Sequence, residues 1–367
     1  MERKYKVWLE VSAVAVRKNI RAFRTLLDKK TKLYAVVKSN AYGHGLLQFS
    51  ALADEYGVDG FCVDSVVEGV KLRAHGITKP ILILGYTLPG LYAVAAKNDI
   101  TVTISSAEAF AAWTKAKARP QFHLKIDTGM HRQGFQPEDL PSLVKKLSTI
   151  HYPLSTFFTG IYTHFAIAKN CNDKAFTEQQ LVTFKEACVA FKKAGFDNFI
   201  YHASATGGAL LGKEFHGDMV RIGIGLYGIW PSQELESQLS KKITLAPVLS
   251  LHSVVSEIKE IKKGDGVGYD FTERVSRDTK LAVIPIGYWH GIPRAASSIG
   301  WVWIGKNKAK IIGRVSMDII TVDVTDIPCK VGTEICMSPL ELARSINASP
   351  YEVITRINPL IYKVIKR

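Results

Sequence analysis

Residues 33–45 read Leu33-Tyr34-Ala35-Val36-Val37-Lys38-Ser39-Asn40-Ala41-Tyr42-Gly43-His44-Gly45, in which a short apolar run ends in a lysine and a glycine-rich polar turn follows. The apolar run predicts a buried β-strand with Lys38 at its last position. Burial of an ammonium group is costly and favours the neutral amine, which is a nucleophile suited to forming a Schiff base. The alternative is a strand-end lysine that points into water.

The segment 35–45 resembles the lysine signature of the alanine racemase family, whose members use pyridoxal 5′-phosphate (PLP). By this resemblance Lys38 would hold the aldehyde of PLP as an imine, and Tyr42 would reach the cofactor phosphate. Further matches extend the resemblance across nearly all 367 residues. It is closest to the cytoplasmic racemase domains of membrane-bound serine/alanine racemases associated with vancomycin resistance, which implies an isomerase that makes a D-amino acid for peptidoglycan precursors.

The composition, with 47% hydrophobic and 22% charged residues, is typical of a soluble globular protein. A chain of this length predicts two domains, although a β/α barrel alone can occupy about 200 residues or more. The five cysteines are scattered without a Cys-x-x-Cys pair, which indicates a reducing compartment and a cytoplasmic location. They are Cys62, Cys171, Cys188, Cys329 and Cys336.

The formal net charge of +15 raises the question of a nucleic-acid partner. The lysines are dispersed and no recognition motif accompanies them, so we expect no nucleic acid. The excess charge instead predicts a solvated surface that attracts anionic small molecules, or one that lies near an anionic membrane. We find no apolar stretch of membrane-spanning length and no leader, so we expect these residues neither to span a membrane nor to be secreted. A membrane segment outside these residues is left open.

Eight short apolar runs alternate with amphipathic helical patterns between about residues 12 and 230. This repetition predicts an eight-stranded parallel β/α (TIM-like) barrel over residues 12–235, with an open doubly wound sheet as the alternative. The predicted strands are 33–38, 60–64, 80–85, 101–104, 122–127, 159–163, 198–203 and 220–225.

Residues 236–367 predict a second, mainly β domain, because long helical patterns stop and short β-rich segments take over. One short helix is expected near 339–346, and the polar segment 231–242 reads as a linker. The resemblance suggests that residues 1–11 add a strand to this domain. Its other predicted strands are 247–260, 280–287, 301–304, 310–315 and 319–324.

Polar residues fall where the barrel strands end, and active sites of such barrels lie at the carboxyl ends of the strands. Any one of them could be an ordinary strand-end residue, but six together favour a site. They are Lys38, Lys125, Asp127, His164, His202 and Arg221.

The segment 220–225, Val-Arg-Ile-Gly-Ile-Gly, resembles the phosphate and pyridine site of the family. Arg221 would face the pyridine nitrogen and leave it unprotonated, which weakens the ring as an electron sink and limits side reactions. The alternative is an ordinary buried glycine-rich strand. The resemblance also places other residues near the phosphate, although Ala205 stands where the family has an asparagine. They are Ser204, Thr206, Gly223 and Ile224.

Racemisation needs two bases, one on each face of the reacting carbon. Lys38 would serve one face, and the segment Gly266-Val267-Gly268-Tyr269 matches the catalytic tyrosine of the family, which the partner subunit supplies. The resemblance therefore implies a homodimer with shared active sites, in which Tyr288 stands at the entrance. A hydrogen-bonded chain from Tyr269 to His164 to Arg221 would help the phenol act near neutral pH, although a lone histidine is more often an ordinary core residue.

Two further motifs would bind the substrate carboxylate. In the segment 125–132, Arg132 would contact the carboxylate and the cofactor phenolate, and Lys125, carried as its carbamate, would orient Arg132. In the segment 313–318, the backbone N–H of Met317 from the partner subunit would bind the carboxylate, and Ser316 replaces the cysteine that is usual there.

Near the C-terminus, Asn358 falls, after a one-residue gap, where alanine racemases carry a tyrosine that crowds the substrate side chain. A carboxamide opens space and offers a donor and an acceptor for a hydroxymethyl group, so we expect the substrates to be serine and alanine, with serine preferred. The alternative for Asn358 is a turn residue before Pro359.

Rival functions are an alanine racemase with little serine activity, a decarboxylase of the same architecture, and a non-racemising PLP-binding protein. Arg221 disfavours a decarboxylase, which would want an acid opposite the pyridine nitrogen. The second domain, with Tyr269 and Met317, disfavours a carrier, because such proteins generally keep the barrel alone. We expect no metal site.

Overall fold

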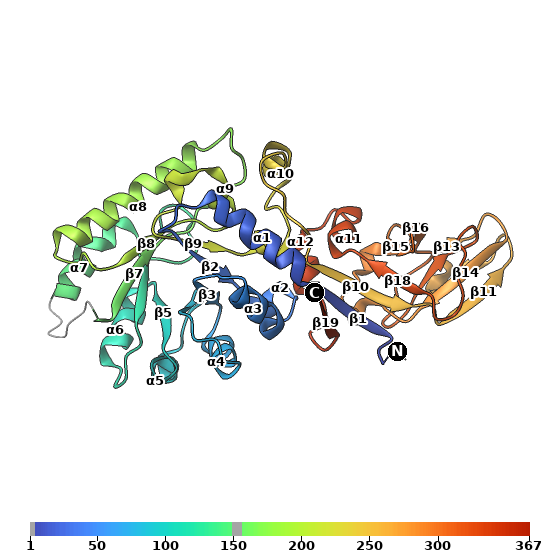
Figure 1. Ribbon diagram of the computed structural model, residues 1–367, viewed down its shortest axis with the longest axis horizontal. Helices are drawn as coiled ribbons and strands as arrows, with labels where there is room; N and C mark the ends of the chain where they lie inside the picture. The colour runs from blue at the N-terminus through green and yellow to red at the C-terminus, as the bar shows by residue number, and fades with distance from the viewer. Residues whose placement is uncertain (1–3, 149–155) are drawn as a thin grey trace. The chain divides into compact units, whose positions relative to one another are not determined.

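The computed structural model describes residues 4–148 and 156–367, which form two compact units (Figure 1). The barrel unit comprises Ala15–Ala41 and Phe49–Ala246. The β unit comprises Met1–Val14, Tyr42–Gln48 and Pro247–Arg367.

The barrel unit contains eight parallel strands in the order β8-β7-β6-β5-β4-β3-β2-β9. The two outer strands meet through hydrogen bonds from Arg221 N to Ser204 O (2.9 Å) and from Asp218 N to Tyr201 O (3.0 Å), which nearly closes the barrel. All eight predicted strands are present, so the predicted TIM-like barrel is confirmed and the open sheet is wrong. The strands are β2 (Lys32–Val36), β3 (Gly60–Val63), β4 (Ile81–Ile83), β5 (Ile100–Ile104), β6 (Phe122–Lys125), β7 (Phe158–Tyr162), β8 (Ile200–His202) and β9 (Met219–Ile222).

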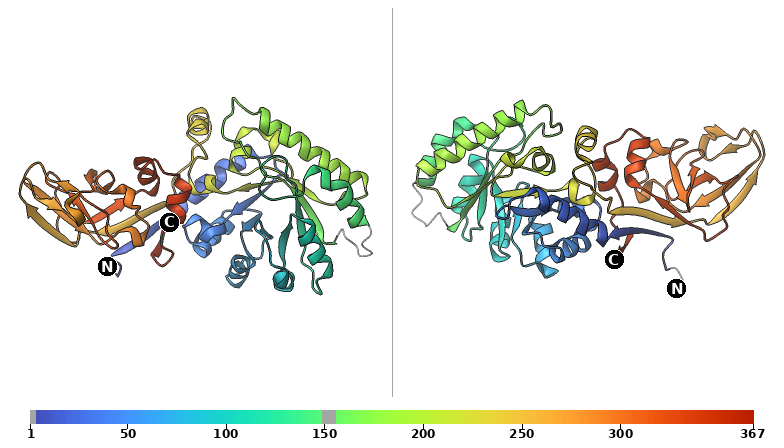
Figure 2. Two further views of the ribbon diagram at one scale, coloured as in Figure 1. Left: turned by 180° about the vertical axis from the view of Figure 1, so that it is seen from behind. Right: turned by 45° about the horizontal axis from the view of Figure 1, so that its top comes forward.

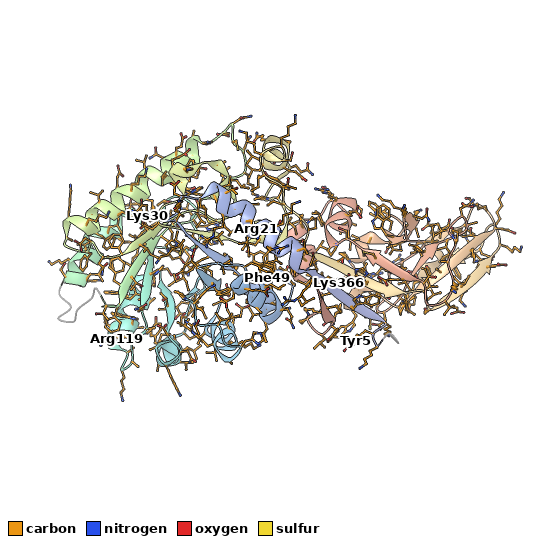
Figure 3. All side chains as sticks on the ribbon, viewed as in Figure 1. Tyr5, Arg21, Lys30, Phe49, Arg119 and Lys366 are labelled. Atoms are coloured by element: carbon orange, nitrogen blue, oxygen red, sulfur yellow. The ribbon has the colours of Figure 1, made fainter. Side chains whose placement is uncertain are left out.

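Helices that follow the strands lie on the outside of the barrel (Figures 1 and 2). Ser65 and Ser106 cap two of them by accepting hydrogen bonds from Glu68 N and Ala109 N. Figure 3 labels Phe49 on α3, and the centroid of its ring lies 4.4 Å from that of Tyr227. The helices are α1 (Ala13–Leu26), α3 (Leu46–Glu55), α4 (Val66–Ala74), α5 (Tyr92–Lys97), α6 (Ala107–Lys115), α7 (Leu140–Ser148), α8 (Ala175–Lys193) and α9 (Thr206–Leu211).

The segment 231–242, which we predicted to be a linker, contains helix α10 (Gln233–Leu239). The hydroxyl of Ser232 accepts a hydrogen bond from Leu235 N (3.1 Å) and starts this helix, and Leu235 is fully buried. The capping serine and the buried leucine explain why a polar segment is helical.

The β unit is built on a six-stranded sheet in the order β16-β15-β18-β10-β1-β19. Strand β1 (Val7–Ser12) pairs antiparallel with β10 (Leu249–Val254) and parallel with β19 (Tyr362–Lys366), so the N-terminal segment is a strand of this sheet. The other elements are β15 (Trp301–Ile304), β16 (Asn307–Lys310), β18 (Glu334–Met337), the three-stranded sheet of β11 (Glu257–Ile261), β14 (Thr279–Ile284) and β17 (Ile320–Asp323), the pair β12 (Gly266–Val267) and β13 (Glu273–Arg274), and the helices α11 (Pro339–Ser345) and α12 (Pro350–Thr355).

The predicted strand 247–260 is two strands, because the chain changes sheets in its middle. Val255 N donates to Thr333 O (2.8 Å), beside β18, and Ser256 N donates to Val283 O (2.9 Å) on β14. The predicted strand 310–315 is also misplaced, since the strand covers 307–310 and only a bridge at Ile311 follows.

No helix within residues 4–148 and 156–367 is both long and apolar enough to cross a bilayer.

Asn19 ties helix α1 to the end of the barrel unit. Its side-chain amide is fully buried, donates to Leu226 O (3.1 Å) and Ala246 O (2.8 Å), and accepts from Ala246 N (2.8 Å). A buried amide in this position satisfies one buried backbone group, Leu226 O, and two partly buried ones on Ala246.

We predict that Asn19→Ala lowers the free energy of unfolding by about 3 kcal/mol, because it removes three hydrogen bonds and leaves Leu226 O buried without this partner. Urea unfolding followed by circular dichroism measures the change. The exposed Asn172 is the matched control, and Asn172→Ala should change stability by less than about 0.5 kcal/mol. Equal effects of the two variants would contradict the assignment.

Candidate active site

A left-handed turn, α2 (Lys38–Tyr42), follows strand β2 and carries two of the predicted cofactor residues, Lys38 and Tyr42. The four residues from Ser39 to Tyr42 have φ between 51° and 57°. The left-handed conformation costs roughly 1–2 kcal/mol for each L-residue, so a run of four stores considerable strain. Strain of this kind is concentrated at functional sites, which supports a binding role for the turn.

The amine of Lys38 pairs with Asp64, at 3.2 Å from Oδ1, and the lysine side chain is 37% exposed. The sequence left open whether the Lys38 amine is buried or points into water, and the structure shows a half-exposed ion pair. Glu68 joins the backbone next to Lys38 to that of Asp64, since its carboxylate accepts hydrogen bonds from Asn40 N (3.3 Å) and Asp64 N (2.8 Å). Sequence reasoning missed Asp64 and Glu68, although Asp64 directly follows the strand next to β2.

Four cations lie close to His164 at the carboxyl ends of the barrel strands. Burial is the largest of the effects that lower the pKa of His164 to about 3, and the charges of Arg221, Arg132, Lys125 and Lys38 contribute next, in that order. The histidine is therefore neutral at any ordinary pH. A concentration of positive charge around a neutral histidine suits a ligand that carries several negative charges.

Lys125, at the end of β6, is buried and donates to Gln133 Oε1 (3.0 Å). Burial lowers its pKa to about 8, and the neighbouring Arg132 is the next largest cause. Gln133 in turn donates to Ser105 Oγ (3.2 Å). Lys125 and Arg132, predicted as a pair, thus lie within electrostatic reach of each other, and Gln133 is a contact that the sequence did not indicate.

The carboxylate of Asp127 organises the loop that carries Arg132. It accepts hydrogen bonds from the backbone N–H groups of Gly129, Met130, His131 and Arg132, at 2.9–3.1 Å. Burial alone would raise the pKa of Asp127, but these four donors outweigh it and the pKa is lowered. Asp127 is therefore a structural anion that fixes the loop rather than a group that contacts a ligand.

Arg221 is buried on β9, and all its guanidinium contacts are in the barrel unit. It donates to the ring nitrogen Nδ1 of His202, to Thr163 O (2.8 Å), to Ala203 O (2.9 Å) and to His202 O (3.2 Å). Within the part of the chain that the structure describes, His164 accepts none of these bonds. The predicted bond from His164 to Arg221 is therefore absent here, and His202 takes that place.

His202 is hydrogen-bonded to a second buried histidine, His123. Because Nδ1 of His202 accepts from Arg221, the neutral ring carries its proton on Nε2 and donates to Nδ1 of His123 (2.9 Å). Burial is the main cause of the low pKa values of both histidines. The pKa of His123 is lowered to about 3 and that of His202 lies well below its usual value. Two neutral rings in series thus hold Arg221 without adding charge, and the sequence had indicated only His202, as a strand-end residue.

The predicted phosphate residues Thr206, Gly223 and Ile224 lie together between β8 and β9. Thr206 Oγ1 accepts from Gly223 N (3.2 Å) and Gly225 N (3.3 Å), which leaves its own O–H able to donate. Ser204 differs, because its side chain is fully buried and its hydroxyl donates to Phe215 O (2.6 Å). The hydroxyl of Ser204 is therefore not available to a phosphate in this structure.

The β unit carries the other predicted residues. An open pocket of about 530 Å³ is lined by Tyr288, Trp289, Met317 and Asn358, together with Arg356, Pro359 and Leu360. Backbone bonds from Tyr288 N to Ser316 O (3.0 Å) and from Trp289 N to Met317 O (2.9 Å) hold its two sides together. The structure thus brings three predicted substrate residues into one pocket.

Tyr269 lies in a short turn of the β unit and is 68% exposed. Gly268 adopts φ 71° and lies against the backbone of Arg314, so the tyrosine loop and the 313–318 loop are neighbours. The next residue, Asp270, pairs with Arg314 at 3.3 Å. Tyr269 and Met317 are therefore presented by adjoining loops.

Asn358 is both a turn residue and a pocket residue. Its Oδ1 accepts from Leu360 N (2.9 Å), which is an Asx-turn, and its Nδ2 donates to Trp289 O (3.2 Å). An amide has two N–H groups and two lone pairs, so one of each remains for a ligand. The alternative, a turn before Pro359, explains the bond from Leu360 N but does not explain the bond to Trp289 O.

The donor set of the barrel unit fits pyridoxal phosphate. An amine stands at a strand end, the Thr206 hydroxyl and the backbone N–H of Ile224, at the start of the turn Ile224–Tyr227, offer donors to a phosphate, and further cations surround His164.

The comparisons with known proteins agree with this site. Residues 11–231 match the alanine racemase N-terminal domain, and residues 248–365 match the alanine racemase C-terminal domain. The alanine racemase of Halothermothrix orenii is 35% identical over 335 residues, which are 90% of this chain and 86% of that protein.

Two solved structures have the same fold over the whole chain. The alanine racemase of Clostridium difficile 630 has a TM-score of 0.91 and 30% identity, covering 100% of this chain and 97% of that one. That of Bartonella henselae, with covalently bound pyridoxal phosphate, has a TM-score of 0.86 and 25% identity, covering 99% and 100%. The chain therefore belongs to the alanine racemase family, the amino-acid racemases whose cofactor is pyridoxal phosphate.

Proposed function

We propose that the protein interconverts the L and D forms of serine and alanine, with Lys38 and Tyr269 of the partner subunit as the two bases. The observation that carries the serine assignment is the pocket in which Asn358 lies beside Met317 and Tyr288. A carboxamide with one spare N–H and one spare lone pair can form hydrogen bonds with the hydroxymethyl group of serine. The methyl group of alanine can form none.

In this proposal the residues divide the work at the reacting carbon. Bound pyridoxal phosphate supplies the electron sink that lets the Cα–H bond of an attached amino acid ionise. The amine of Lys38 removes or returns the proton on one face, and the hydroxyl of Tyr269 does so on the other. Arg132 and the backbone N–H of Met317 of the partner subunit hold the carboxylate, and Tyr42, Thr206, Gly223 and Ile224 hold the phosphate.

A homodimer with shared sites follows from the same assignment. The β unit exposes apolar and aromatic side chains that a second copy would cover, including Tyr269 (68%), Met317 (55%) and Tyr288 (43%). We place the enzyme in the cytoplasm, because all five cysteines are free thiols, as in a reducing compartment.

The second candidate is an alanine racemase with little serine activity, which the names of the curated relatives favour. The likeness to serine/alanine racemases of vancomycin resistance depends on Asn358 alone. Kinetics on L-alanine and L-serine side by side, with added pyridoxal phosphate, separate the two candidates.

We predict that Lys38→Ala and Tyr269→Phe, each inactive alone, restore racemisation when the two variants are mixed, unfolded and refolded together. Half of randomly assorted dimers are hybrids, and each hybrid has one site with both bases, so about one quarter of all sites are intact. Racemisation of L-alanine measures the recovery, and each variant refolded alone is the control. No recovery in the mixture would contradict a site shared between subunits.

For the specificity, we predict that Asn358→Tyr lowers the ratio of kcat/KM for L-serine to that for L-alanine by roughly 10-fold or more, since the phenol fills the space and the amide contact is lost. Asn358→Ala separates the two effects, because it keeps the space and removes the amide. A ratio that falls in both variants supports a hydrogen bond to the substrate hydroxyl. A ratio unchanged in Asn358→Tyr would remove the serine assignment.

For Lys125, we propose a carbamate that turns a buried cation into an anion beside Arg132. Carbon dioxide reacts with the neutral amine, and because burial lowers the pKa of Lys125 from 10.5 to about 8, carbamate formation should rise as the pH increases through about 8. Carbon-13 NMR with labelled bicarbonate detects the carbamate carbon. The signal should vanish in Lys125→Met and persist in Lys174→Met, a control at another partly buried lysine. A signal that persists in Lys125→Met would contradict the modification.

A further inference from the structure

Three neighbouring strands of the six-stranded sheet place metal-ligating side chains on one face. Strand β10 lies between β1 and β18, and His252 is opposite Trp8 on one side and Cys336 on the other. Glu10 and Glu334 are each two residues from those partners, so they point to the same face. Figure 1 labels these three strands side by side. The strands thus gather an imidazole, a thiol and two carboxylates.

The ring of His252 is oriented by one carboxylate and faces the other ligands. Its Nδ1 lies 3.0 Å from Glu334 Oε1, and its Nε2 lies 3.6 Å from Glu10 Oε2 and 3.8 Å from Cys336 Sγ. The hydroxyl of Ser250 is also 2.8 Å from Nε2. A histidine that donates from one nitrogen to a carboxylate and turns the other toward ligands has the usual arrangement of a metal-binding histidine.

The distances match those of a tetrahedral zinc site. Zinc bonds of about 2.0–2.1 Å to nitrogen, 2.0–2.2 Å to oxygen and 2.3 Å to sulfur imply about 3.4 Å between nitrogen and oxygen ligands and about 3.6 Å between nitrogen and sulfur. The observed separations of 3.6 Å and 3.8 Å exceed these by about 0.2 Å. Ligand atoms of Glu10, His252 and Glu334 lie within 4.8 Å of one another, and rotation of the Cys336 side chain toward Glu10 would complete the proposed ligand set.

The carboxylate of Glu10 is held in the required orientation. Its Oε1 accepts from Trp8 Nε1 (3.2 Å) and pairs with Lys366 Nζ (3.1 Å), and this leaves Oε2 directed toward His252. Lys366 is labelled in Figure 3 on the last strand of the sheet. The side chains of Glu10 and His252 are 20% and 9% exposed, so the position is largely enclosed but reachable from solvent.

We propose that Glu10, His252 and Cys336 bind a zinc-class divalent ion, with Glu334 orienting His252. A water molecule or the Ser250 hydroxyl takes the fourth position. Binding breaks the S–H bond of Cys336, forms a metal–sulfur bond and releases one proton to solvent. The ion joins residues 10, 252 and 336, so its effect is to fix the N-terminal strand in the sheet. None of these residues takes part in the proposed racemase chemistry.

The test uses the holoenzyme, freed of adventitious metal with a chelator and then titrated with Co²⁺ or Zn²⁺. We expect one ion per chain after gel filtration, a rise in Tm, and the intense visible bands of tetrahedral Co²⁺, recorded as a difference spectrum so that pyridoxal phosphate cancels. The fluorescence of Trp8, whose ring stacks on His252 at 5.3 Å, should change on binding.

Variants assign the ligands. Cys336→Ser and His252→Gln should abolish the cobalt bands and the Tm shift, and Glu334→Gln should weaken binding by about 10–100-fold. Cys329→Ser, at another partly buried cysteine of the same unit, is the matched control and should bind as the wild type does. Racemase activity of the chelated enzyme, measured in parallel, keeps this result separate from the proposed function.

Several outcomes would overturn the proposal. One is the absence of stoichiometric Co²⁺ or Zn²⁺ with no change in Tm, which would leave His252 as an imidazole paired with two carboxylates. Another is binding that is unchanged in Cys336→Ser or His252→Gln.

Discussion

Repulsion among four cations around His164 is the constraint on which the barrel unit depends. Parallel strands bring their carboxyl ends to the same end of a barrel, so these side chains cannot avoid one another. The structure offsets the repulsion with groups that are negative or electron-rich. Asp64 pairs with Lys38, and the ring of Tyr162 lies 5.0 Å from the guanidinium of Arg221 and 5.6 Å from the amine of Lys125. Anionic ligands complete the balance.

Two neutral histidines hold Arg221 in place without changing the charge of the site. His202 and His123 support Arg221 through ring nitrogens, where carboxylates would neutralise the guanidinium and add negative charge. The charge of Arg221 is therefore available to whatever faces it. The β unit has the opposite character, since it presents an exposed phenol at Tyr269 and an apolar, open pocket next to Asn358. The cation-rich site and the open pocket thus lie in different parts of the chain.

The barrel was predictable because its strands are buried on both faces and read as continuous apolar runs. Strands β18 and β19 were missed because they are short and contain charged residues; β18 buries only alternate residues, and β19 buries none of its residues fully. Site residues carried by strand ends, such as Lys125 and Arg221, were predictable by the same rule. The partners that orient them, such as Asp64 and Gln133, depend on side-chain directions across strands, which no linear pattern contains. Ser204 was predicted to lie near the phosphate because its motif matches the family, but its hydroxyl lies in the core and donates to Phe215 O.

The position of β1 sets the order in which the chain can fold. This strand lies between β10 and β19 in the sheet, and both of these strands follow the whole barrel segment in the chain. During synthesis β1 therefore leaves the ribosome long before either neighbour exists, and the barrel segments emerge while it waits. The sheet is completed only once residues 362–366 have been made, so its unpaired edge must be kept from other chains until then.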